Sequence, residues 1–137
     1  MVHIRATLRM AGATFSPRAA VQLTGVPLSS SREPGELVHS GRYAGRPSPY
    51  GSAEIRAPGT AKFLDGQEDE FFARVSILAR AAKTLGADDV VLHLDIEHDG
   101  QCNIEFKPAF VAAVQRLGVP LTMTCYQGDP VKTSSDP

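Results

Sequence analysis

A histidine and two carboxylates near the centre of the sequence are the side chains best suited to chemistry: His93, Asp95 and Glu105. Imidazole and carboxylate groups that converge can hold a divalent metal ion. They lie in two segments, 89–97 and 102–106, where apolar and polar residues alternate as in strands with one buried face. No compact ligand motif such as His-Glu-x-x-His is present. The same residues therefore also fit a solvated polar sheet face, whose acids are neutralised by basic residues of another strand.

The turn between these two segments decides which residues face one another. A two-residue turn, Asp99-Gly100, would put the apolar residues of the two strands on opposite faces, because a one-residue slip exchanges faces. A three-residue turn, His98-Asp99-Gly100, with a bulge at the glycine puts them on one face. The resulting pairs are Ile96–Cys102, Leu94–Ile104 and Leu92–Phe106. This register predicts that His93 faces Glu105 across a hairpin.

A second candidate set lies in a segment rich in Pro, Gly and Ser, from residue 27 to 62. It contains the arginines Arg32, Arg42, Arg46 and Arg56, with the tyrosines Tyr43 and Tyr50. Arginines beside aromatic rings can clamp phosphates, stack on bases or form the hot spot of a protein interface. Acidic residues in the same segment dilute its charge, which favours a protein partner or an inert surface loop over nucleic acid.

The elements that position these residues follow from hydrophobic periodicity, caps and Gly/Pro breakers. The predicted strands are 2–10, 52–57, 89–97, 102–106 and 121–126, and the predicted helices are 17–24, 66–85 and 108–117. In chain order this is β-α-β-α-β-β-α-β. We expect an α+β fold with a single mixed or antiparallel sheet of about five strands and three helices packed on one face. The other face, carrying Arg5, Arg9 and Thr124 beside His93 and Asp95, should be open or covered only by the long loop.

Composition sets further bounds. The 137 residues predict one domain, 1–127, followed by a flexible tail, 128–137. Lys and Arg number 14 against 15 Asp and Glu, so no strong overall field favours nucleic acid or a membrane. No apolar run is long enough to span a bilayer, and the N-terminus lacks the apolar core of a secretory signal. The two cysteines, Cys102 and Cys125, fall on predicted inward faces and indicate buried thiols in a reducing cytoplasm.

Several segments together resemble a known family. They are Phe15-x-Pro17 with Gly25-Val26-x-Leu28, the Gly/Arg-rich segment to Gly51, the long amphipathic helix, and Phe106-Lys107-Pro108 with the helix ending at Leu117-Gly118-Val119-Pro120-Leu121. Their order and spacing resemble the bacterial domain of unknown function 4279. That family has no established activity, so the resemblance implies no residue roles. Small proteins of such families are often encoded beside toxins, and the resemblance therefore implies an immunity-type role.

We therefore expect a non-enzymatic cytoplasmic binding module without a cofactor that meets a protein partner, with a toxin as one candidate. The expected contact residues are Arg5, Arg9, Arg42, Tyr43, Arg46, Tyr50, His93, Asp95, Glu105 and Thr124. The alternative is a small-molecule or metal-binding domain that uses His93, Asp95 and Glu105. The sequence leaves the oligomeric state open.

Overall fold

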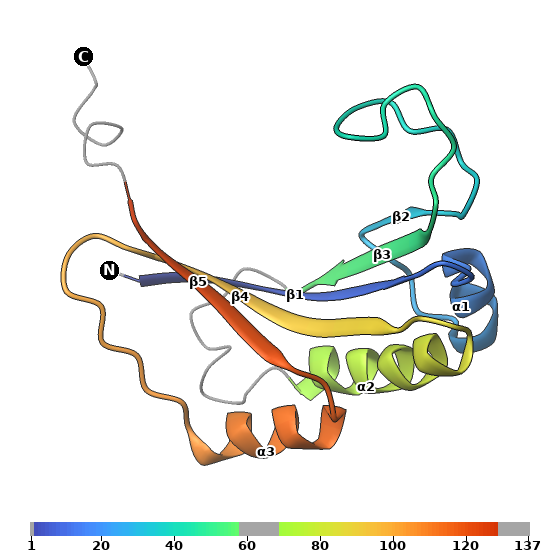
Figure 1. Ribbon diagram of the computed structural model, residues 1–137. Helices are drawn as coiled ribbons and strands as arrows, with labels where there is room; N and C mark the ends of the chain where they lie inside the picture. The colour runs from blue at the N-terminus through green and yellow to red at the C-terminus, as the bar shows by residue number, and fades with distance from the viewer. Residues whose placement is uncertain (1, 58–68, 129–137) are drawn as a thin grey trace.

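The computed structural model describes residues 2–57 and 69–128 and shows one five-stranded sheet with helices beneath it (Figure 1). The strands lie in the order β2-β3-β1-β4-β5. Strand β1 is antiparallel to both of its neighbours, whereas β4 and β5 are parallel. The elements are β1 (Val2–Gly12), α1 (Pro17–Thr24), β2 (Ser30–Arg32), β3 (Gly51–Arg56), α2 (Asp69–Thr84), β4 (Asp89–His98), α3 (Pro108–Leu117) and β5 (Leu121–Gln127).

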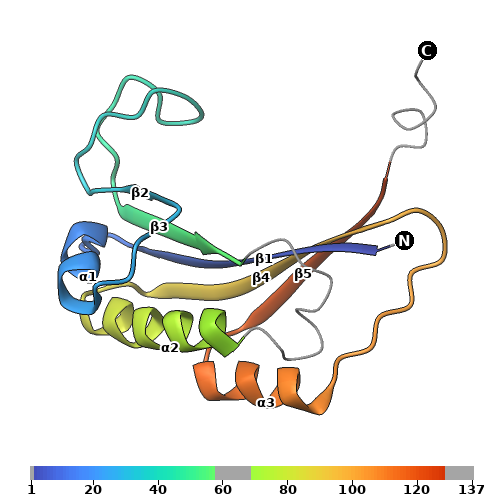
Figure 2. The same ribbon diagram turned by 180° about the vertical axis from the view of Figure 1, so that it is seen from behind.

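All three helices lie on the same side of the sheet, as the reverse view also shows (Figure 2). Alternation along β1 and β4 directs their apolar side chains toward the helices. There they pack with α2 and α3 into one core, whose fully buried members include Leu8, Leu92, Leu94, Ile96 and Phe110. The predicted fold class, a mixed sheet of about five strands with three helices on one face, is confirmed.

Helix α1 begins and ends at the residues that the sequence indicates. The Ser16 hydroxyl oxygen accepts a hydrogen bond from the Ala19 amide at 3.2 Å, and Pro17 occupies the first turn. Gly25, with φ of 72°, closes the helix in the left-handed conformation. The start of the predicted helix 66–85 lies outside the described residues, and α2 is described from Asp69. No helix in the described ranges is both long and apolar enough to cross a bilayer.

The predicted hairpin strand at 102–106 is wrong. Both edges of β4 are occupied, one by β1 and the other by β5, so no edge remains for residues 102–106. This segment instead descends toward α3 and packs its apolar side chains against the core (Figure 1). One of them, the Phe106 ring, stacks on Phe110 with centroids 5.4 Å apart. The fifth strand is the short β2, which was not predicted.

Residues 33–50 form a hairpin-like projection, the flap, on the side of the sheet opposite the helices (Figure 1). Its two arms are joined by the Leu37–Pro47 bridge and by four backbone hydrogen bonds of 2.8–2.9 Å, among them Gly35 N–H to the Ser48 carbonyl. Val38, only 2 % exposed, is buried between the arms outside the main core. The flap is therefore an ordered structure with its own small centre.

Candidate functional site

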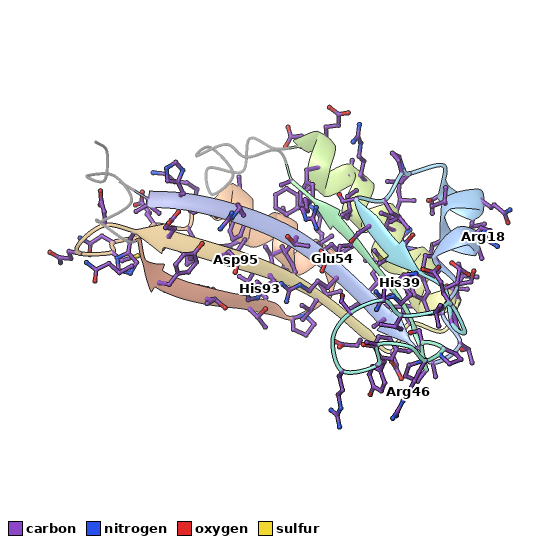
Figure 3. All side chains as sticks on the ribbon, turned by 90° about the horizontal axis from the view of Figure 1, so that it is seen from above. Arg18, His39, Arg46, Glu54, His93 and Asp95 are labelled. Atoms are coloured by element: carbon purple, nitrogen blue, oxygen red, sulfur yellow. The ribbon has the colours of Figure 1, made fainter. Side chains whose placement is uncertain are left out.

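The sheet face away from the helices carries polar side chains in cross-strand rows (Figure 3). In the central row Thr7 of β1 lies between Arg56 of β3 and His93 of β4. Neighbouring rows place Arg5 beside Asp95, and Arg9 beside Glu54. Period-two alternation therefore brings Arg5, Arg9, His93, Asp95 and Thr124 to one face, as the sequence predicted.

His93 is the most enclosed titratable group on this face, with only 9 % of the residue exposed. Its Nδ1 lies 2.6 Å from the Thr122 hydroxyl, and its Nε2 lies 3.2 Å from both Asp95 Oδ1 and the Thr124 hydroxyl. A neutral ring with its proton on Nε2 would donate to Asp95 while Nδ1 accepts from Thr122. Both ring nitrogens are thus occupied within the protein, and the cluster joins β4 to β5.

Glu105 does not lie opposite His93, and this part of the predicted site is wrong. It belongs to the connection that leads to α3, where its carboxylate accepts a hydrogen bond of 2.6 Å from Lys107. That hydrogen bond and the ammonium charge lower the pKa of the Glu105 carboxyl. Within residues 2–57 and 69–128, no three His, Cys, Asp or Glu side chains converge on one point. The three residues that the alternative reading assigned to a metal, His93, Asp95 and Glu105, are therefore not brought together.

A pocket of about 360 Å³ lies on the open face at the base of the flap. Its charged lining consists of Arg9, Arg32, Glu54 and Asp89, and Tyr50 and the serines of β2 and β3 complete it. Glu54 is shared by two guanidinium groups, Arg9 at 3.7 Å and Arg56 at 3.4 Å. The sequence did not indicate Glu54 and Asp89 as site residues, because only the strand order brings them close to Arg9 and Arg32.

The flap combines aromatic and cationic side chains at the end of the sheet remote from His93 and Asp95 (Figure 3). Tyr43 and Tyr50 pack edge to face with centroids 6.4 Å apart. The Arg42 guanidinium lies 5.8 Å from the Tyr43 ring centre, within cation–π range. Arg46 is exposed and forms no ion pair with a described residue. All four residues expected from the 27–62 segment therefore belong to one projecting unit.

Glu33 ties the base of the flap to the start of α1. Its carboxylate accepts hydrogen bonds from the Ser16 hydroxyl at 2.6 Å and from the Arg18 amide at 2.8 Å. A carboxylate is favourable at this position because the first amides of a helix are unpaired and carry partial positive charge. The link holds an acidic residue of the flap away from its tip, where Arg42 and Arg46 lie.

We expect Glu33→Ala to loosen the flap without unfolding the sheet. Removing two hydrogen bonds to a charged acceptor should raise the rate of trypsin cleavage after Arg42 by roughly tenfold. Timed digestion followed by mass spectrometry measures this rate. Glu105→Ala removes a surface carboxylate elsewhere and should leave the rate unchanged; equal cleavage of the two variants would contradict the role of Glu33.

The cysteines differ from the expectation of buried thiols. Cys102 is half-buried, and Cys125 is exposed. The alternation in β5 does direct Cys125 toward the helical side of the sheet, but β5 is an edge strand whose lower face is incompletely covered. The position of the strand in the sheet, and not its polarity pattern, decides this exposure.

Comparison with known proteins adds no relative: no protein-family description matches the chain, and no curated protein or solved structure is significantly similar to it. Its function is therefore inferred from the geometry of the open face and the flap.

Proposed function

We propose that this chain is a non-enzymatic binding module that recognises a protein partner with its open sheet face and its flap. The observation that carries the proposal is the projecting flap, in which Arg42 and Tyr43 of the tip pack with Tyr50 of the base at one end of the polar sheet face. Arginine and tyrosine are enriched among the residues that dominate binding energy in protein interfaces. Neutralisation of a toxin, the role implied by the resemblance to the domain of unknown function 4279, is the specific form that we propose.

Preorganisation supports this proposal. The backbone hydrogen bonds between the flap arms, buried Val38 and the link through Glu33 restrict the flap before any partner arrives. An ordered recognition element loses less conformational entropy on binding than a disordered one. The unpaired thiols of Cys102 and Cys125 fit the reducing cytoplasm that we propose as its compartment.

A small-molecule binding function is the second candidate, and the pocket at the flap base favours it. Such a ligand would meet Arg9 and Arg32 and also the carboxylates of Glu54 and Asp89. This chemistry suits a small polar molecule with groups of both charges. It would not use His93, whose ring nitrogens are occupied within the protein.

Site-specific photo-crosslinking tests the protein-binding proposal. A photoreactive amino acid at position 46 in the flap should capture one protein in the source cells, and the same probe at position 74 on α2 should not. For that purified protein, the double variant Arg42→Ala/Tyr50→Ala should lose affinity by at least about thirtyfold, since two hot-spot side chains are removed. Arg74→Ala, which removes an exposed arginine outside the site, should bind as tightly as the wild type.

Two outcomes of these experiments would contradict the protein-binding proposal. Equal affinity of the flap variant and the wild type, or capture only from position 74, would contradict the proposal. Native mass spectrometry of protein purified from source cells would favour the second candidate if it found a retained small molecule that is lost in Arg9→Ala/Arg32→Ala.

A further inference from the structure

Strand β5 forms one edge of the sheet, and the backbone groups along its outer side bond to no residue within 2–57 and 69–128. The Leu92 amide donates to the Pro120 carbonyl, and the Gly128 amide donates to the His98 carbonyl. Even-numbered residues of β5 therefore direct their backbone groups toward β4, in the parallel register that the strand pairs show. Because successive residues alternate, the backbone groups of Leu121, Met123, Cys125 and Gln127 point outward.

This edge lacks the usual features that prevent strand pairing. Exposed edges are commonly protected by charged residues, proline, bulges or short length. The seven residues of β5, Leu-Thr-Met-Thr-Cys-Tyr-Gln, include no charge, proline or glycine. The opposite edge strand, β2, has only three residues and leads directly into the flap. The apolar side of β5 is also uncovered, since Met123 is 44 % exposed and Cys125 is exposed.

We propose that a second copy of this chain pairs antiparallel with β5 and continues the sheet. A two-fold axis through Thr124 places Met123 opposite Cys125 of the second copy, and Leu121 opposite Gln127. In this register all four outward-pointing residues find partners, whereas shifting the strands by two residues leaves backbone groups at the ends unpaired. No charge opposes another, and the exposed Met123 and Cys125 side chains cover one another.

The self-complementary strand favours a second copy over an unrelated strand. Closed two-fold symmetry is the commonest arrangement of soluble oligomers, and it requires a surface that matches itself. Because the two copies continue one sheet with their helices on the same side, the dimer would present both flaps on the other side. The flap lies at the far side of the molecule from β5, so the two flaps would stand at opposite ends of the continuous sheet (Figure 1). This inference is independent of the proposed protein-binding function.

Sedimentation equilibrium of the full chain tests the dimer. Over about 1 µM to 1 mM, the range in which small interfaces associate, the mass should rise from 14.6 kDa toward twice that value. Met123→Lys introduces a charge on the exposed side of the edge and should weaken association by at least about tenfold. Ile77→Lys places the same charge at an exposed apolar residue of α2 and should not change it. Circular dichroism melts of both variants should match that of the wild type, which checks that they fold.

Disulfide trapping tests the register. In an antiparallel pair the Thr124 Cα atoms would be about 4.5 Å apart, within the roughly 4.4–6.8 Å that a disulfide spans. With Cys125 replaced by serine, Thr124→Cys should form a linked dimer at least ten times faster than Gln127→Cys, which the two-fold axis keeps far from its own copy. A monomer at every concentration, dimerisation unchanged by Met123→Lys, or equal crosslinking of the two cysteine variants would overturn the proposal.

Discussion

Gly51→Ala is expected to abolish folding or to lower the free energy of unfolding by about 3 kcal/mol or more. Gly51 is the first residue of β3, where the chain leaves the flap and pairs with Gly12 of β1. A Cβ atom at this position would overlap the Phe15 carbonyl oxygen. Phe15 is fully buried, and its amide is bonded to the Gly12 carbonyl, so the obstructing backbone cannot move aside without disturbing the core.

Urea denaturation followed by circular dichroism measures this effect. Gly100→Ala is the matched control, because a Cβ there would have no neighbour within 4 Å and its backbone is not left-handed. We expect the control to unfold within about 0.5 kcal/mol of the wild type. If the urea midpoint of Gly51→Ala equals that of Gly100→Ala, the backbone of Gly51 does not lie as close to the Phe15 carbonyl as the structure places it.

His93→Ala is expected to lower the free energy of unfolding by about 2–3 kcal/mol. The substitution removes a nearly buried ring and leaves Asp95 and the hydroxyls of Thr122 and Thr124 without their common partner. Since the two threonines belong to β5, we also expect the His93→Ala substitution to accelerate amide hydrogen exchange, relative to the wild type, more in β5 than in β1. Thermal and urea unfolding measure the stability, and exchange followed by NMR measures the local effect.

The matched control for this variant is His3→Ala, which removes an exposed histidine from the same face of the sheet. It should change the unfolding free energy by no more than about 0.5 kcal/mol. If His93→Ala is as stable as His3→Ala, the cluster does not fasten β5 to the sheet, and His93 is then free for another role on this face.

Polarity alternation and helix caps predicted much of this fold, because each depends only on residues that are neighbours in the sequence. Alternation in β1 and β4 reflects one buried face, and Ser16, Pro17 and Gly25 act on the backbone of their own helix. These signals also placed Arg5, Arg9, His93 and Asp95 on a common face. Each of these results depends only on the period of a strand or on a cap, and not on which strands are neighbours.

Strand order was beyond such patterns. Residues 102–106 alternate in polarity like a strand, but this alternation indicates only that one side of the segment is buried. Phe106 and its apolar neighbours are buried by packing on the core, and the segment pairs with no strand. The chain instead returns through α3 to place β5 parallel to β4. The misplaced Glu105 and the exposed Cys125 follow from this competition for the free edge of β4, whereas the pocket with Arg32 and Asp89 follows from the pairing of β2 with β3 and of β4 with β1.

The flap carries Arg42, Tyr43 and Arg46, which we propose to contact a partner, on a part of the chain that takes no share in the pairing of the five sheet strands. Gly35 and Ser48 meet at its base, so the residues between them leave and re-enter the molecule at nearly one point. Insertions or substitutions in the tip would change the length or the side chains of this surface segment without altering the register of any sheet strand. Related chains could then vary the residues of the tip under selection by a changing partner, while buried Val38 and Gly35 at the base keep the conformation of the flap.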